Sequence, residues 1–233
     1  MKKLLLTLTV LMIATVASAK DNRPVVAVLE FKNETSASWW YSGVGRELSD
    51  MLSNELLGTG AFKVVERKKL DAVLTEQDLG ASGRVKRSTA AKMGQVTGAQ
   101  YLITGSVASF EESGSKGGGL SFKGVSFGGK KKTASLGIDI RVVNATTGEV
   151  EYARTIEGTS KSGGMSIGLH KNGFGGQLGS EKKTPTGKAI RAALIEATDY
   201  LACVMVDQDG CEADYRAKEK KRRKKTRSSL SLD

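Results

Sequence analysis

Apolar residues recur along the chain at two spacings, one typical of strands and one typical of helices. Residues 24–31 (PVVAVLEF) are apolar at nearly every position and predict a buried strand. Apolar residues then follow helical spacing, and Gly58 and Gly60 mark the end of this first predicted helix. The apolar face of that helix consists of Val44, Leu48, Met51, Leu52 and Leu56.

The middle of the chain predicts two further strands and two further helices. Residues 62–66 alternate as a strand does, and residues 99–110 form a longer apolar strand. Residues 67–78 predict a second helix, and Ser88 is the expected N-cap of a short third helix that ends at Val96. The second helix is expected to turn Leu70, Val73 and Leu74 inward.

The pattern after residue 135 predicts a β-hairpin and a long final helix. Residues 136–144 alternate between apolar and polar side chains, residues 145–148 (ATTG) predict a turn, and residues 149–156 predict the returning strand. After Pro185, one helix face holds Ile190, Leu194, Ala197, Leu201, Val204 and Met205. Together these elements predict an α/β fold with a mixed sheet and covering helices.

Two glycine-rich windows flank the predicted hairpin. Residues 113–137 contain eight glycines and residues 158–187 contain nine, out of 28 in the chain. Each window leaves the domain and returns to it, so we expect two insertions, at about 113–135 and about 158–184. Two interpretations are open: β-hairpins that join an outer-membrane barrel, or flexible surface loops.

The barrel interpretation assigns membrane-facing positions by alternation. The candidates are Leu120, Phe122, Val125, Phe127, Met165, Ile167 and Leu169. If the first set is followed along a single strand, Gly124 shifts the parity and places the last two residues on the opposite face, which would require a β-bulge. Neither window contains tryptophan, so the aromatic girdles of membrane barrels are missing.

The N-terminus has the features of a secretory signal peptide over residues 1–19. Two lysines precede an apolar run at 4–17, and Ala-Ser-Ala at 17–19 has the small-x-small form of a cleavage site. The run is short for a membrane anchor, which is the alternative, and no cysteine stands near the cleavage point for acylation. We therefore expect export to the periplasm or outer membrane.

The net charge of +11 is concentrated near the C-terminus. Residues 218–233 contribute +6, the signal peptide +2, and residues 20–217 only +3. The domain is expected to span 20–205, followed by a basic tail at 206–233, in which the charged run 218–233 is expected to be solvated and disordered. Such a tail suits an anionic envelope surface, such as lipid headgroups or lipopolysaccharide, better than nucleic acid, which an exported protein rarely meets.

The chemistry-bearing residues do not predict an enzyme. Cys203 and Cys211 are the only cysteines and His170 is the only histidine, too few ligands for a metal site. No GxSxG motif or Walker phosphate loop is present, and no cofactor is predicted. In an oxidising compartment the two cysteines form a disulfide across eight positions or remain as two thiols that point apart.

Four segments in this order resemble the curli production assembly/transport (CsgG/HfaB) family: VAVLEFKNETS, AFKVVERKKLDAVLTEQ, TGAQYLITGSVASFEE and IDIRVVNATTGEVEYARTIEGTSKS. The resemblance covers about residues 24–205. It implies a periplasmic α/β domain in a ring-shaped homo-oligomer, with each subunit lending two hairpins to one shared outer-membrane barrel. Curli-like or adhesive proteins would pass unfolded through this pore, and the family's hairpins coincide with the two glycine-rich windows.

The resemblance also implies a pore constriction in the loop at residues 35–42, formed by Trp39 and Trp40 with Tyr41 beside them. The alternative is that the tryptophans form a hydrophobic staple on the following helix. The chain departs from the family in three respects: no acylated cysteine, hairpins richer in glycine and lysine, and a basic tail. The alternative function is therefore a soluble periplasmic module that assists envelope or secretion-system assembly, and a third is polyanion binding by the tail.

Overall fold

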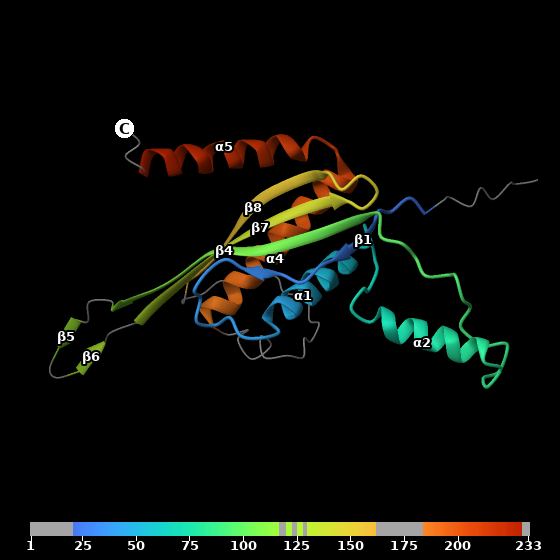
Figure 1. The fold of residues 1–233 in the computed structure, drawn as a ribbon. Coiled ribbons are helices and arrows are strands. Elements are labelled where there is room, and N and C mark those ends of the chain that lie inside the picture. The colour runs from blue at the N-terminus through green and yellow to red at the C-terminus, as the bar shows by residue number, and fades with distance from the viewer. Residues whose placement is uncertain (1–20, 117–119, 123–124, 128–129, 162–183, 230–233) are drawn as a thin grey trace, which may run out of the picture.

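A computed structural model describes residues 21–116, 120–122, 125–127, 130–161 and 184–229. It contains a mixed sheet with the strand order β3-β1-β4-β7-β8, and β2 pairs with β4 beside this path (Figure 1). The strands are β1 (Val25–Val28), β2 (Lys32–Asn33), β3 (Lys63–Val64), β4 (Tyr101–Lys116), β7 (Lys130–Asn144) and β8 (Val150–Lys161). β1 is parallel to β3 and β4, whereas β4, β7 and β8 are antiparallel.

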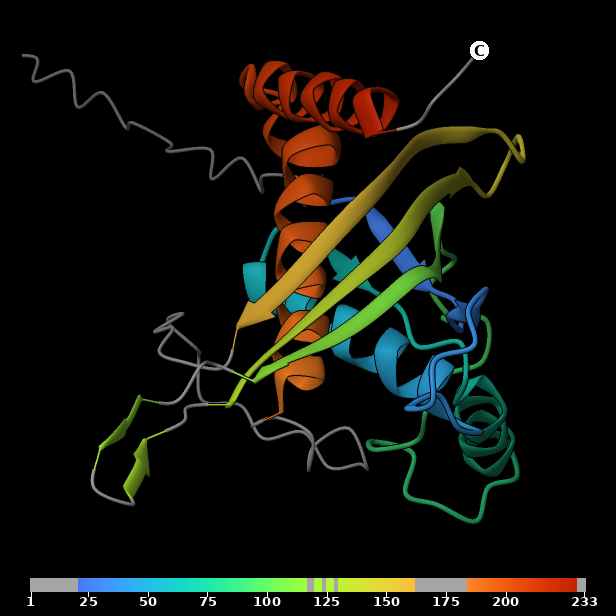
Figure 2. The same ribbon diagram turned by 90° about the vertical axis from the view of Figure 1, so that its left-hand side faces the viewer.

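Two helices cover one face of the sheet, and a third lies on the other side of it (Figures 1 and 2). The covering helices are α1 (Val44–Thr59) and α4 (Pro185–Ala202). A π-helical turn, η2 (Cys203–Asp207), continues α4, and α5 (Cys211–Ser229) then runs back across the top of the molecule in Figure 1. The predicted α/β architecture with a mixed sheet and covering helices is confirmed.

The core lies between the sheet and the two covering helices. The predicted faces of α1 and α4 are buried, and so are Ile138, Ile140 and Val142 on β7. Met205 is the exception on the last helix face, because it is only half-buried. α4 approaches β8 closely at Gly158, where an added Cβ would collide with the backbone of Ala189 and Ala193. Glycine at this position therefore sets the distance between helix and sheet.

The predicted hairpin at 136–156 is confirmed, and its strands are longer than predicted. β7 and β8 pair from Thr133↔Lys161 to Val143↔Val150, with a turn between them.

Thr184 caps α4, because its side-chain oxygen accepts a hydrogen bond from the Gly187 amide at 3.0 Å.

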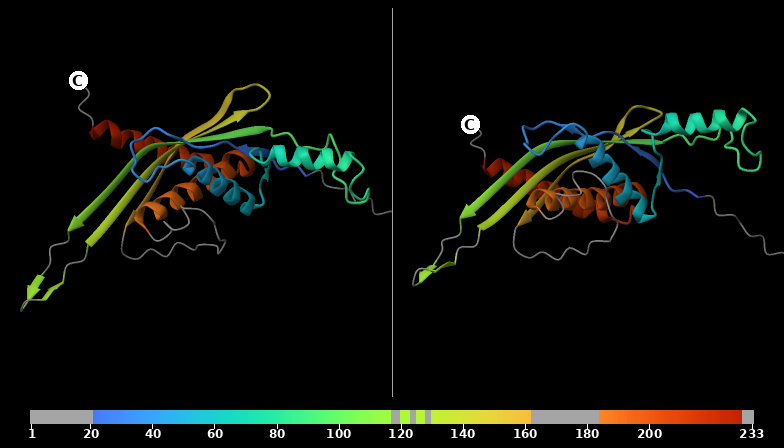
Figure 3. Two further views of the ribbon diagram at one scale, coloured as in Figure 1. Left: turned by 60° about the horizontal axis from the view of Figure 1, so that its bottom comes forward. Right: turned by 90° about the horizontal axis from the view of Figure 1, so that it is seen from below.

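The second helix was predicted with an inward apolar face, and this prediction was wrong. In α2 (Leu70–Ala81) both Val73 and Leu74 are 44% exposed, and only Gln77 is buried. The helix extends away from the sheet, as Figure 3 shows from two further directions. The apolar spacing identifies a face of the helix correctly, but no core element reaches that face among the described residues.

Two other predictions about helices also require correction. Residues 88–96 do not form a helix: one turn closes where the Thr89 amide donates to the Lys86 carbonyl at 3.0 Å, and Gly94 adopts a φ of 73°. Left-handed backbone at that point ends any helix. The tail, whose charged run was predicted to be disordered, forms α5 over residues 211–229, although none of its residues is buried. Ion pairs three or four residues apart, such as Arg222–Glu219, support it.

Candidate functional site

The central hairpin leaves the domain at one end and carries the first glycine-rich window with it. β4 and β7 stay paired without interruption from Ser109↔Gly137 out to Lys116↔Lys130, well beyond the helices that cover the sheet (Figure 1). Two short strands then continue the excursion, β5 (Leu120–Phe122) and β6 (Val125–Phe127). The first insertion is therefore a β-hairpin and not an irregular loop.

The register of β5 and β6 corrects the expected parity of the apolar residues. Leu120 pairs with Phe127, and Phe122 pairs with Val125, in antiparallel fashion. Directly opposed positions in an antiparallel pair share a face, and so do positions two apart on one strand. All four apolar positions therefore lie on one face of this ribbon, and Ser121 and Ser126 lie on the other. No β-bulge at Gly124 is needed, because 120–127 belongs to two strands and not to one.

The second glycine-rich window lies between the described elements. β8 ends at Lys161 and α4 begins at Pro185, so the window connects the outer strand of the sheet to the helix that packs on it. The candidate positions Met165, Ile167 and Leu169, and the lone His170, lie outside the described residues.

The loop that carries the aromatic residues is held at the same end of the domain as the hairpin (Figure 1). The Phe31 amide donates to the Gly45 carbonyl at 3.1 Å, and β2 pairs with β4 through Lys32↔Ser106. Asn33 then closes a tight turn, since its side-chain oxygen accepts from the Thr35 amide at 2.9 Å and from the Thr35 hydroxyl at 2.7 Å. The loop is therefore pinned to β4 before the tryptophans.

The three aromatic side chains predicted to constrict a pore are half-buried and pack against the core. The rings of Trp39 and Trp40 lie 5.6 Å apart, and Trp39 meets Phe110 edge-on at the same distance. The Nε1 of Trp39 is buried and has no hydrogen-bond partner among the described residues. The Tyr41 hydroxyl donates to Glu47 in α1 at 3.0 Å.

This cluster joins the loop to the base of the hairpin. Trp39 contacts β4 at Phe110, and the staple on the following helix stays a prediction. Phe110 was not among the candidate residues. Its place at the end of an apolar run, next to the polar start of the glycine-rich window, was the only signal in the sequence.

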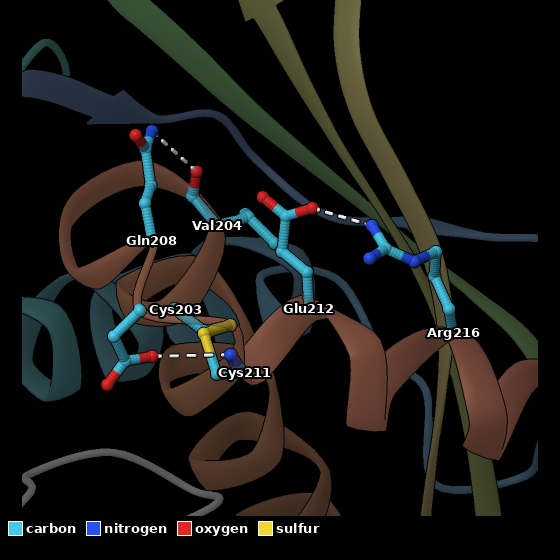
Figure 4. The surroundings of a disulfide bond; sticks show 7 residues. Cys203, Val204, Gln208, Cys211, Glu212 and Arg216 are labelled. Atoms are coloured by element: carbon cyan, nitrogen blue, oxygen red, sulfur yellow. Dashed lines mark hydrogen bonds and ion pairs between the residues drawn. A yellow bond between two sulfur atoms is a disulfide. The ribbon is translucent and has the colours of Figure 1, made fainter.

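A disulfide and the hydrogen bonds around it join α5 to the rest of the domain. Cys203 and Cys211 form a disulfide with their Cα atoms 6.0 Å apart (Figure 4). It closes the short connection in which Gln208 takes left-handed backbone and donates to the Val204 carbonyl at 3.3 Å. The Cys211 amide donates to Asp209 at 3.2 Å, which satisfies one of the first amides of α5.

Beyond the disulfide, one arginine connects the outer strand to α5. The guanidinium of Arg154 lies 5.2 Å from the ring centroid of Tyr200 and 4.8 Å from that of Tyr215. It also donates to the Tyr215 carbonyl at 3.0 Å. Burial of the phenol raises the pKa of Tyr215 to about 12, with smaller contributions from Glu196 and Asp199. The sequence alone gave no signal for this cluster, because its residues lie on three separate elements.

Within the described residues no group of three or more His, Cys, Asp or Glu side chains could hold a metal ion. No helix in the same part of the chain is long and apolar enough to cross a membrane.

Comparison with known proteins identifies the family. The chain belongs to the CsgG family, because the family model for the curli production assembly/transport component CsgG matches residues 8–230. The resemblance drawn from the sequence is thereby confirmed. No curated protein matches the chain.

Several solved structures are similar to the chain at low identity. The hypothetical protein CT253 from Chlamydia trachomatis is 15% identical, with a TM-score of 0.45 over 78% of this chain and 96% of that one. Lipoprotein GNA1162 from Neisseria meningitidis is 12% identical, with a TM-score of 0.34 over 62% and 88%. The PelC dodecamer from Paraburkholderia phytofirmans is 12% identical, with a TM-score of 0.35 over 75% and 85%. Likenesses this weak carry no inference about function.

Proposed function

We propose that this chain is one subunit of a ring-shaped secretion channel in the outer membrane, through which unfolded curli-like or adhesive proteins leave the cell. Family membership and the predicted signal peptide support the proposal. The observation that carries it is the register of the first hairpin, in which Leu120, Phe122, Val125 and Phe127 share one face. Alternation of an apolar and a polar face is the pattern of membrane β-barrel strands.

The channel needs no chemistry of its own. Subunits would pack side by side with a heterologous interface that closes into a ring. The two hairpins of each subunit would line up as barrel strands, with serines and glycines toward a water-filled lumen. Trp39, Trp40 and Tyr41 would narrow the passage below the barrel, since their loop lies at the hairpin end of the domain.

A soluble periplasmic assembly module is the second candidate, and one observation favours it. Lysine occupies positions 116, 130, 131 and 132, and Lys116 pairs with Lys130. Because residues 130 and 131 are consecutive on a strand, lysine occurs on both faces of the hairpin stem. A charge on the lipid face of a barrel costs about 2–4 kcal/mol at the midplane and little near the interface. The stem must therefore lie at or below the membrane surface if the channel is formed.

The test measures the native mass and the detergent requirement of the chain extracted from cell envelopes. The proposal expects a large ring that stays in solution only with detergent. A small species released without detergent would refute it and would favour the assembly module.

Two matched substitutions test the hairpin directly. Phe122→Arg places a charge on the apolar face, whereas Ser121→Arg places the same charge on the adjacent position of the opposite face. We expect Phe122→Arg to abolish recovery of the membrane-bound ring and Ser121→Arg to preserve it. Equal behaviour of the two variants would show that this ribbon does not distinguish lipid from lumen.

A further inference from the structure

A long cleft separates α5 from the outer part of the sheet. It has a volume of about 1210 Å³ and is bounded by β7, β8, the end of α4 and the length of α5. α5 lies beside β8 in Figure 1. The two elements meet where Arg154 reaches Tyr215. Further along α5, the hydrogen bond to Glu219 raises the pKa of Arg222, and Glu157 and Asp139 on the sheet add smaller contributions.

The sheet side of the cleft is an outer strand. In the part of the sheet that the structure describes, β8 pairs with β7 alone. An outer strand presents a row of amide and carbonyl groups that can accept another strand. Tyr152, Ala153, Arg154 and Thr155 follow one another along β8 and line the cleft, together with Asp139, Ile140 and Arg141 of β7.

The helix side of the cleft is basic. Eight arginines and lysines line the cleft against three carboxylates. Each carboxylate is already engaged: Asp139 accepts from Thr155 at 2.7 Å, Glu212 from Arg216 at 2.8 Å, and Glu219 from Arg222 at 2.8 Å. The bases that have no ion pair among the described residues are Arg141, Arg154, Lys220, Lys224 and Arg227, and of these Arg154 already donates to the Tyr215 carbonyl.

We propose that this cleft binds an extended acidic polypeptide segment, which adds as a strand beside β8 and directs its carboxylates to the bases of α5. Main-chain pairing to an outer strand supplies affinity, and the basic wall selects acidic side chains. The lengths agree, since the 19 residues of α5 span about 28 Å and an extended segment of about eight residues spans roughly 27 Å. The site is separate from the hairpins and the aromatic loop, so it does not depend on the formation of a channel.

The composition of α5 disfavours a lipid surface as the occupant. A helix that lies on a membrane buries an apolar face in the headgroup region. After Tyr215, the only apolar residue of α5 is Ala217. The bases of α5 line a cleft whose other wall is formed by strands of the sheet.

The experiment uses the full mature chain and a fluorescent, end-blocked peptide of about eight residues that alternates glutamate and threonine. Two double variants carry the same loss of charge on the same helix. Lys220→Gln with Lys224→Gln removes two bases of the cleft, and Lys221→Gln with Lys225→Gln removes two that do not line it. All four residues are exposed, so both variants should fold.

We expect the wild-type chain to bind the peptide, the cleft variant to bind about fivefold more weakly, and the control variant to stay within about twofold. A second peptide, methylated on alternate backbone nitrogens along one edge, should lose binding because it cannot pair as a strand. Equal weakening of peptide binding by the two double variants would overturn the proposal, because the peptide would then be attracted by the net charge of the helix and not by the bases of the cleft. Binding of phosphatidylglycerol vesicles or a DNA oligonucleotide with no binding of the acidic peptide would also overturn it.

Discussion

The disulfide between Cys203 and Cys211 should both stabilise the domain and hold α5 in place. It closes a loop between positions eight apart in the sequence. In the chain-entropy description, closing a loop of that length removes about 8 cal/mol/K from the unfolded chain, which corresponds to about 2.5 kcal/mol at 25 °C. Reduction should therefore lower the free energy of unfolding by up to about that amount.

The measurement compares urea unfolding of the oxidised and the reduced wild-type chain. Reduction is the cleaner perturbation because Cys203 is buried and a serine there would also bury a hydroxyl. With a urea slope of about 2–3 kcal/mol/M, the midpoint should fall by roughly 1 M.

Trypsin digestion gives a local measurement of the same effect. α5 holds most of the basic residues of the C-terminal region, so its cleavage reports how often it leaves the domain. Without the disulfide, the contacts that still hold α5 include the Tyr215–Tyr200 ring pair at 5.2 Å, the hydrogen bond from Arg154 to the Tyr215 carbonyl at 3.0 Å and the ion pair of Lys218 with Glu196 at 3.2 Å. Faster cleavage in α5 on reduction is expected. The reasoning is refuted if the oxidised and reduced chains unfold at the same urea concentration and α5 is cleaved at the same rate.

Three further predictions concern the core, the aromatic loop and α5. Gly158→Ala should destabilise the domain by about 1–3 kcal/mol, because the Cβ of the new alanine would collide with the α4 backbone. Gly58→Ala should stabilise the domain by up to about 1 kcal/mol, because Gly58 lies in α1 with open space around it. Thermal unfolding of the two variants checks both predictions. Trp39→Ala should lower the free energy of unfolding by about 2 kcal/mol, because the contact with Phe110 is lost. Trp39→Phe should lower it much less, because it keeps an aromatic ring and removes a buried N–H that has no partner among the described residues. Equal denaturant midpoints for the two variants would contradict this. Hydrogen bonds from Arg222 and Arg223 hold the pKa of Glu219 below its ordinary value of 4.5. The stability that Glu219 gives to α5 is therefore complete above pH 4.5 and is lost as the pH falls through the lowered pKa. Circular dichroism during acid titration should show this loss of helicity in the wild-type chain, and a Glu219→Gln variant should not show it.

The elements whose evidence is local were predicted well. The hairpin at 136–156 and the buried faces of α1 and α4 follow from periods of 2 and 3.6 residues, which any short window of the sequence displays. The predictions that were wrong concern patterns that are compatible with more than one tertiary arrangement. Val73 and Leu74 form an apolar face in α2, but whether a face is buried depends on what packs against it.

The parity of the first hairpin is a clear example of that limit. Along one strand, Val125 and Phe127 would oppose Leu120 and Phe122, but in two paired strands all four share a face. The same residues thus support opposite conclusions until the pairing is known. Which residues of two strands pair depends on the tertiary structure, whereas the sequence shows only how apolar and polar residues alternate within each strand.

By itself, the sequence determined the family, the α/β class and the composition of each face, because these depend on residues close together in the chain. Only the tertiary structure decided which faces meet. It joined Trp39 to Phe110 at the base of the hairpin, and it set Arg154 between tyrosines of α4 and α5. It also placed a basic helix beside an outer strand about 60 residues earlier in the chain. Contacts over such separations depend on how the sheet and helices close around one core, which local periodicity does not encode.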